Sequence, residues 1–318
     1  MWAGPMAEAS GPVASVDCGT NTVRLLVLDP ATGATLTRKA RIVRLGEGVD
    51  ATGRITRAAL DRADEVLREF GEVAAAYGVR RLRVGATSAT RDAENGSEFV
   101  TAVEQRLGVT PDVLSGAEEA QLTFGGALRH LDPDLPGPVL VADVGGGSTE
   151  LVLGDAHDRS RIVSADSLQV GSVRLHERHL HDDPPTAAQV AAVRADLDEA
   201  LRSSPVDAAS AATVVGVAGT ALTIAAGALR LSPEGLEDDL TPLRGAVLDA
   251  EAVHAEVDRI VALPVADRLG GPLMSPGRAD VIGAGGLVLS SVLHHAEAER
   301  LVVSEADILD GLAWSLVR

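Results

Sequence analysis

The sequence predicts an α/β protein made of two similar lobes that face each other across a cleft. Strand and helix patterns alternate along most of the 318 residues, which is the arrangement of α/β proteins. A strand, an Asp-x-Gly turn and a second strand also occur twice, once around residue 17 and once around residue 143. A repeat on this scale indicates two related lobes, and the length suits two domains of roughly 100–200 residues each.

The composition excludes several classes of protein. The chain has 28 basic and 46 acidic residues, a net charge of −18, whereas a general nucleic-acid binder needs a basic face. Aromatic residues make up only 2% of the chain, so little is available for stacking on single-stranded bases. With one cysteine, no disulfide can form within the chain. We therefore expect no nucleic-acid partner, although a few clustered arginines can still bind phosphate.

No membrane segment or export signal is expected. Residues 1–17 lack the positively charged start and the apolar run of a signal peptide. Residues 208–229 carry no charge and are long enough to cross a bilayer, but they contain three glycines and several hydroxyl side chains. This pattern favours a strand, a glycine turn and a buried helix, and hence a cytoplasmic protein without a membrane partner.

The first half begins with an antiparallel hairpin, residues 13–16 and 23–28, around a polar turn. The elements expected after it are a strand over 35–45, a helix over 55–77, a buried strand over 82–86 followed by a Ser/Thr-rich turn to residue 91, and helices over 98–107 and 115–128. Ser115 precedes Glu118 by three residues, the spacing of a capping box at a helix start.

The turn DPDLPGP at 132–138 is the expected junction between the halves. The sequence thus predicts an N-terminal domain over 1–134, a second domain over 135–305, and a C-terminal helix over 306–318 that packs back on the first. The second hairpin pairs 139–142 with 151–153. The later elements are helices over 186–203, 250–262, 279–293 and 307–318, and strands over 213–217 and 301–304.

The two hairpin turns have the composition of phosphate-binding loops. Turns of Gly, Ser and Thr expose backbone N–H groups, which bind anions such as phosphate. Asp17 precedes the first turn and Asp143 the second, where each can hold a divalent ion that bridges phosphate oxygens. Neither the dinucleotide fingerprint nor the Walker loop is present at these turns. A single turn of this kind is often only a tight turn, but two matching ones indicate a phosphate site.

Eight segments together resemble the exopolyphosphatase/guanosine pentaphosphatase (Ppx/GppA) family of the actin-like superfamily. They are VASVDCGTNTVRLLVLD (13–29), RIVRLGEGVD (41–50), VGATSATRDAENG (84–96), LSGAEEAQLTFGGAL (114–128), VADVGGGSTELVLG (141–154), QVGSVRLHERHL (169–180), VVGVAGTALTIAA (214–226) and VSEADILDGL (303–312). The resemblance covers essentially the whole chain, and the length fits members without a C-terminal helical extension. It implies two actin-like (ribonuclease H-like) domains with a cleft between them.

The resemblance also implies roles for particular residues. Glu119 matches the general base for the attacking water, and Arg91 matches an arginine that faces the phosphoryl group. The expected metal ligands are Asp143, Glu150 and Asp17. The expected phosphate-binding residues are Gly19, Thr20, Asn21 and Arg24 in and after the first turn, and Gly145, Gly146, Gly147 and Ser148 in the second.

The activity implied is Mg²⁺-dependent hydrolysis of the terminal phosphate of inorganic polyphosphate, with Mn²⁺ as an alternative ion. The missing extension favours short polyphosphate chains as substrates. The related activity within the family is removal of the 5′-phosphate of guanosine pentaphosphate. Two alternatives stay open: a non-catalytic polyphosphate or nucleotide sensor, and an ATP-dependent kinase, because residues 214–226 resemble a nucleotide loop. A homodimer is a further alternative, since C2 dimers are the commonest oligomers.

Other candidate residues have simpler interpretations. His176, His179 and His181 have metal-like spacing but lie at a polar helix end, and Cys18 is best interpreted as a packing residue. Near the end of the chain, Ala306 and Leu309 stand where many family members have glycine and arginine. This departure leaves the substrate preference open.

Overall fold

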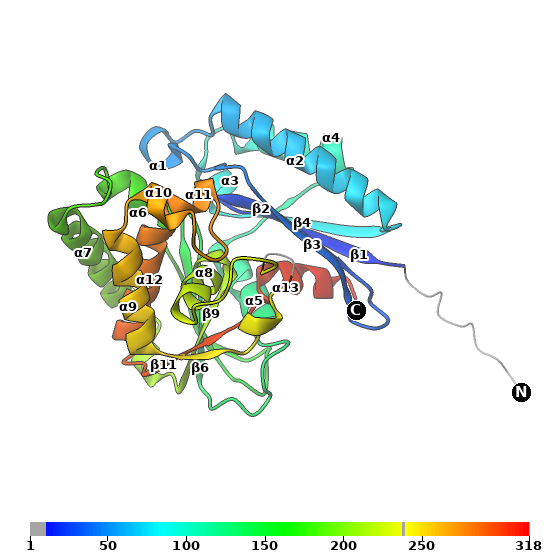
Figure 1. Ribbon diagram of the computed structural model, residues 1–318. Helices are drawn as coiled ribbons and strands as arrows, with labels where there is room; N and C mark the ends of the chain where they lie inside the picture. Colours follow the sequence, from blue (N-terminus) through cyan, green and yellow to red (C-terminus); the bar gives the residue numbers. More distant parts are fainter. Residues whose placement is uncertain (1–10, 237–238, 318) are drawn as a thin grey trace, which may run out of the picture.

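Two β-sheets, each with helices packed on it, form the frame of the protein (Figure 1). This computed structural model describes residues 11–236 and 239–317. The first ten residues, on which part of the expectation about an export signal rests, lie outside the described residues. The α/β fold class predicted from the sequence is confirmed.

The first sheet has the strand order β3-β2-β1-β4-β5. Its strands are β1 (Val13–Cys18), β2 (Thr22–Leu28), β3 (Thr35–Ile42), β4 (Arg81–Ala86) and β5 (Asp112–Val113). The helices of this half are α1 (Val49–Thr52), α2 (Arg57–Ala76), α3 (Ser88–Asp92) and α4 (Gly96–Leu107). The apolar face of α2, with Leu67 and Phe70 buried, packs on the same core cluster as β1 and β2.

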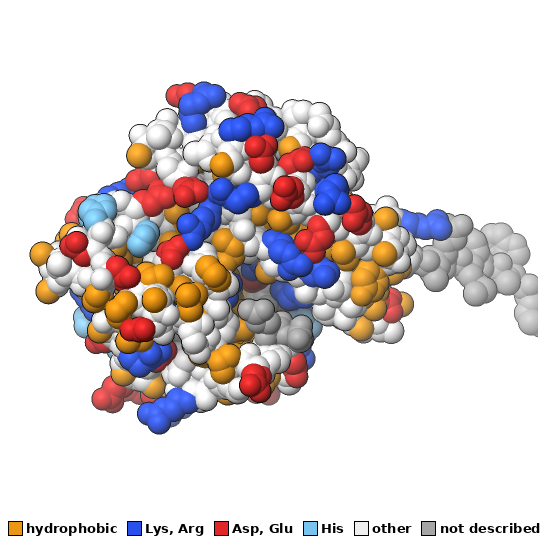
Figure 2. Space-filling model, turned by 45° about the horizontal axis from the view of Figure 1, so that its top comes forward, with side chains coloured by type: hydrophobic (Ala, Val, Ile, Leu, Met, Phe, Trp, Pro, Cys, Tyr) orange, Lys and Arg blue, Asp and Glu red, His pale blue; other side chains and the backbone are white. Residues whose placement is uncertain are grey.

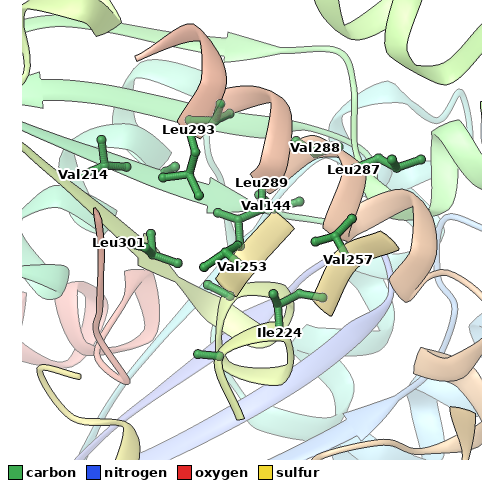
Figure 3. Packing of buried hydrophobic residues seen from close by; sticks show 14 of the residues in the cluster. Val144, Val214, Ile224, Val253, Val257, Leu287, Val288, Leu289, Leu293 and Leu301 are labelled. Atoms are coloured by element: carbon green, nitrogen blue, oxygen red, sulfur yellow. The ribbon is translucent and has the colours of Figure 1, made fainter. Parts of the chain in front are cut away.

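The second sheet has the order β10-β11-β9-β6-β7-β8. Its strands are β6 (Val139–Val144), β7 (Thr149–Gly154), β8 (Ile162–Leu168), β9 (Thr213–Val217), β10 (Val247–Asp249) and β11 (Arg300–Val303). The helices are α6 (Ser172–His179), α7 (Ala187–Ser203), α8 (Ala218–Ala228), α9 (Ala250–Ala262), α10 (Val265–Arg268), α11 (Pro276–Ala279) and α12 (Ile282–His295), with short 3₁₀ turns at Ala208–Ser210 and Thr241–Leu243. Side chains of α8, α9 and α12 meet β6 in one apolar core (Figure 3).

The two hairpins have equivalent surroundings, as the repeat in the sequence predicts. β1 is antiparallel to β2 and parallel to β4, and β6 is antiparallel to β7 and parallel to β9. In each hairpin the aspartate is the penultimate residue of the first strand: Asp17 lies opposite Arg24, and Asp143 lies opposite Glu150. The same register places both glycine turns at corresponding ends of the two sheets.

Helices α5 (Gly116–Ala127) and α13 (Ile308–Ser315) lie next to each other between the sheets (Figure 1). Phe124 of α5 packs against β6 and β7, whereas Leu309 of α13 packs against β1 and β2. The two helix backbones approach closely at two glycines. A Cβ added at Gly126 would lie 2.0 Å from the carbonyl oxygen of Asp307, and one at Gly311 would lie 2.1 Å from that of Leu122. Only glycine therefore fits at these positions.

The Gly311→Ala substitution is expected to lower the free energy of unfolding by about 1–3 kcal/mol or more, because the added methyl group must push α5 and α13 apart. Thermal and denaturant unfolding measure the change. Gly125→Ala is the matched control: nothing lies within 4 Å of its added Cβ, so a gain of about 0.5–1 kcal/mol from helix propensity is expected. A Gly311→Ala protein as stable as the wild type would contradict the close packing.

Several element boundaries differ from the sequence prediction. The Ser/Thr-rich segment after β4 forms the short helix α3, in which Thr90 and Arg91 donate backbone hydrogen bonds to the Thr87 carbonyl. Strand β3 ends at Ile42, because the next two amides donate to Asn21 in the first turn. The helix predicted over 279–293 spans 282–295 instead, and a separate short helix, which Pro276 begins, ends at residue 279 before it.

The uncharged segment 208–229 folds as a 3₁₀ turn, strand β9 and helix α8, as predicted. Within the residues that the structure describes, no helix combines the length and apolar character needed to span a bilayer.

Candidate functional site

A cavity of about 700 Å³ opens where the two hairpin turns face each other. Its wall includes all of the predicted site residues except Arg91, namely Asp17, Gly19, Thr20, Asn21, Arg24, Glu119, Asp143, Gly145, Gly146, Gly147, Ser148 and Glu150. Acidic and basic side chains are interspersed on the face of the molecule shown in Figure 2. The structure thus brings predicted residues from three separate segments, 17–24, 119 and 143–150, into one site.

Backbone hydrogen bonds fix the orientation of the first turn. The Thr20 carbonyl accepts from the Gly46 N–H at 2.8 Å, and the Asn21 carbonyl accepts from the amides of Val43 and Arg44 at 2.9 Å. Because C=O and N–H point in opposite directions across a planar trans peptide, the amides that follow these carbonyls point away from segment 43–46.

The second turn is held in the same way by the start of α6. The Gly145 carbonyl accepts from the Ser172 amide at 2.9 Å, and the Gly146 carbonyl accepts from the Val173 amide at 2.8 Å. The Gly147 carbonyl accepts from Arg174 Nε at 2.7 Å. The amides that follow therefore point away from α6, in a turn whose residues line the cavity. This gives two sets of backbone donors of the kind that binds phosphate.

The two turns also contact each other. Ser88 of α3 lies beside the first turn, since its Oγ is 2.8 Å from Thr20 Oγ1. A Cβ added at Gly147 of the second turn would lie 2.4 Å from the same Ser88 Oγ. A Cβ added at Gly146 would lie 2.9 Å from the Cβ of Thr20. Glycines in the second turn are therefore needed for the two lobes to meet here.

Four of the predicted site residues are carboxylates buried around the cavity: Asp17 of β1, Glu119 of α5, Asp143 of β6 and Glu150 of β7, each between 2% and 7% exposed. Burial is the main cause that raises the pKa of each one. For Glu119, burial and then the charge of Glu150 raise the pKa to about 9. Glu150 also raises the pKa of Asp143. These carboxyl groups therefore cannot all ionise at neutral pH unless positive charge is bound among them.

Helix α5 places Glu119 through the predicted N-terminal cap. Ser115 Oγ accepts a hydrogen bond from the Glu118 amide, and Glu118 Oε2 accepts one from the Ser115 amide at 2.9 Å. The predicted capping box is therefore confirmed. Glu118 thereby stays exposed at the helix start, while the next residue, Glu119, is buried.

Arg91 lies against Glu119 instead of lining the cavity. Its Nη1 donates to Glu119 Oε2 at 3.2 Å and to the Leu114 carbonyl at 2.8 Å. The guanidinium therefore supports the carboxylate from outside the cavity and partly offsets the rise of the Glu119 pKa.

Arg24 is held by two carboxylates. Its Nε and Nη2 donate to Asp17 Oδ2 at 2.9 and 2.6 Å, and its Nη1 pairs with Asp307. Asp17 Oδ1 is buried without a hydrogen-bond partner in the described part of the chain. Asp307 was missed at the sequence level. Its segment departs from the family pattern at Ala306 and Leu309, but no local pattern indicates that Asp307 pairs with a residue 283 positions away.

The histidine cluster does not form a metal site in residues 11–236 and 239–317, where no three His, Cys, Asp or Glu side chains form a metal-binding group. Instead, His179 Nε2 lies 2.8 Å from Asp196 Oδ2. Cys18 is fully buried in the first core, and burial raises the pKa of its thiol, in agreement with a packing role.

Comparisons with known proteins agree with this geometry. Residues 27–318 match the model of the Ppx/GppA phosphatase family. The chain is 40% identical to Exopolyphosphatase 2 of Mycobacterium tuberculosis, over 96% of this chain and 98% of the relative. It is 31% identical to Exopolyphosphatase 1 of Mycobacterium bovis, over 93% and 86%.

Solved structures give the same result. A crystal structure of an exopolyphosphatase-like protein superposes with a TM-score of 0.90 at 40% identity, over 96% of this chain and 99% of that one. The Aquifex aeolicus Ppx/GppA family member gives a TM-score of 0.77 at 30% identity, over 96% and 97%. These matches confirm both the fold and the resemblance inferred from the eight sequence segments. The chain belongs to the Ppx/GppA phosphatase family.

Proposed function

We propose that this protein is an exopolyphosphatase, a hydrolase that removes the terminal phosphate of inorganic polyphosphate. The observation that carries the proposal is the buried carboxylate of Glu119 in a cavity lined by two phosphate-type turns. The relatives named above as exopolyphosphatases support it, since they align over nearly the whole chain.

Hydrolysis of a phosphoanhydride depends mainly on positioning and on neutralising charge. The amides of the two turns would hold the oxygens of the terminal phosphate. Glu119 would orient the attacking water and accept its proton, a role worth roughly 10²–10⁴-fold. Burial raises the pKa of Glu119 in the metal-free protein, so a cation bound beside it would be needed to keep the carboxylate ionised at neutral pH and able to accept that proton.

The donor set at the cavity fits a Mg²⁺ ion. Asp143 and Glu150 are directly opposite each other on β6 and β7, so their side chains are on the same face of the sheet. Asp17 adds a buried oxygen that has no hydrogen-bond partner among the described residues. Mg²⁺ usually takes one or two carboxylates and completes its shell with water and substrate phosphate, so no group of three converging side chains is required. The ion, or Mn²⁺ in its place, would supply the positive charge that a polyanion needs beside these carboxylates.

Guanosine pentaphosphate is a second candidate substrate, favoured by the shape of the cavity. Beyond the two turns its wall includes apolar side chains of the second half, Leu222, Leu273, Pro276 and Ile282. These offer a surface for a nucleoside that an inorganic chain does not need.

Orthophosphate release tests the proposal. We would offer tripolyphosphate, long-chain polyphosphate and guanosine pentaphosphate with Mg²⁺, and ATP with and without a sugar acceptor. We expect release from polyphosphate without ATP, with the ranking of the substrates settling the preference. Binding of polyphosphate without release would support a sensor, and a requirement for ATP plus acceptor would support a kinase; either outcome would contradict the proposal.

A further inference from the structure

Asp307 lies in the turn between β11 and α13, and its side chain is 1% exposed at the wall of the same cavity. One oxygen, Oδ1, accepts from the Leu309 amide at 2.9 Å and caps α13. The other, Oδ2, pairs with Arg24. The Asp307 amide donates to Asp310 Oδ2 at 3.1 Å, which closes a capping box. The carboxylate is therefore fixed by its own helix as well as by the arginine.

The surroundings hold α13 in place on two sides. The glycine contacts of Gly126 and Gly311 bring α13 against α5, the helix that carries Glu119. On the other side, Ser15 Oγ donates to the Leu309 carbonyl at 2.7 Å, and Ser15 is two residues before Asp17 on β1. Asp307 is thus fixed relative to both Glu119 and Asp17.

The guanidinium of Arg24 is paired with a carboxylate on two sides, with Asp17 on one and with Asp307 on the other. Nε and Nη2 donate to a single oxygen of Asp17, and Nη1 points to Asp307. The remaining oxygen of Asp17 has no hydrogen-bond partner in the part of the chain that the structure describes. A guanidinium with free donors beside a polyphosphate would instead form charge-assisted hydrogen bonds with its oxygens.

We propose that Asp307 is a positioning residue for the hydrolysis: by pairing with Arg24 it keeps this arginine on Asp17 and away from the substrate phosphates. This inference rests on the proposed function of the cavity. Its first consequence is that Asp17 presents a fixed free oxygen. The second consequence is that the backbone turns, and not Arg24, bind the substrate, which places its terminal phosphate where Glu119 can act on it.

Asp307→Asn tests this directly, because asparagine caps a helix about as well as aspartate and only the charge is lost. Freed from Asp307, Arg24 is expected to pair with phosphate. For Mg²⁺-dependent hydrolysis of tripolyphosphate we expect kcat to fall about tenfold and KM to fall as well, the pattern of tighter but less productive binding. Asp307→Ser also keeps a capping oxygen and should show the same split if the asparagine variant folds poorly.

Equilibrium binding separates this inference from the proposed function. Tripolyphosphate is titrated into Glu119→Gln and into the Glu119→Gln, Asp307→Asn double variant, both with Mg²⁺, and the double variant should bind more tightly by about tenfold, one charge-assisted contact. Asp64→Asn is the control, since it breaks an ion pair of the same type with Arg106 outside the cavity wall. It should leave kcat, KM and Kd unchanged.

A fall in kcat with unchanged KM and unchanged Kd would show a merely structural role and would overturn the inference, as would wild-type kinetics or weaker binding. If the wild type hydrolysed nothing, the proposed function would fail, but the Kd comparison would still decide whether Asp307 withholds Arg24 from phosphate.

Discussion

Replacing Glu119 with glutamine is expected to lower kcat for phosphate release by about 10²-fold or more while leaving the fold intact. Glutamine keeps the size of the side chain and one hydrogen-bond acceptor for Arg91, but it cannot accept a proton from water. Steady-state kinetics on tripolyphosphate measure the effect.

The neighbouring Glu118→Gln is the matched control. Glu118 is exposed and closes the capping box, in which glutamine can take the same place. We expect this variant to retain wild-type kcat. Turnover near the wild-type level in Glu119→Gln would remove Glu119 from the mechanism.

The thermal stability of the metal-free protein gives a second test of the Glu119→Gln variant. The folded protein keeps a proton on Glu119 up to about pH 9, whereas the carboxyl of the unfolded chain titrates near 4.5. The unfolded chain therefore binds fewer protons between these values, and the free energy of unfolding falls as the pH rises through this window. Glu119→Gln removes this loss, so its Tm should exceed that of the wild type by an amount that grows from pH 5 to pH 9.

Replacing Asp143 with asparagine is expected to lower kcat by about 10²-fold at a fixed Mg²⁺ concentration, and chelation of divalent ions should abolish wild-type activity. Loss of one anionic ligand weakens the hold on a hard cation, and with it the stabilisation of charge on the transferred phosphate. Part of the activity should return at high Mg²⁺. Calorimetric titration with Mg²⁺ and Mn²⁺ measures the affinity directly.

Asp155→Asn controls for the change of charge. Asp155 directly follows the other end of β7, outside the cavity wall, and accepts a backbone hydrogen bond from His157 at 2.9 Å. This variant should bind the ion and turn over like the wild type. An Asp143→Asn protein with unchanged ion affinity and unchanged kcat would place the metal elsewhere.

Features with a local cause could be predicted from the sequence. The hairpins follow from apolar runs on either side of a glycine turn, and the start of α5 follows from Ser115 and Glu118. The cavity followed from the repeat, because two similar hairpins in two lobes bring their turns to equivalent edges. The hairpin and helix-cap signals each span only a few residues, and the repeat compares two such short signals.

Features that depend on distant partners could not be predicted. Strand β8 has the mixed sequence IVSADSL and is defined by its pairing with β7. The position of Arg91 depends on α3 being a helix instead of a turn, which directs its guanidinium to Glu119. The pairing of Arg24 with Asp307 joins β2 to a turn near the end of the chain, so neither residue indicates the other in the sequence.

The most direct test of the central claim is a ³¹P NMR time course of tripolyphosphate with the wild-type protein and Mg²⁺. Removal of a terminal phosphate predicts orthophosphate and pyrophosphate appearing in equal amounts, with no acceptor added, and the reaction absent in Glu119→Gln. An unchanged spectrum, or phosphate that appears only on an added acceptor, would contradict the assignment of this cavity as the site of an exopolyphosphatase.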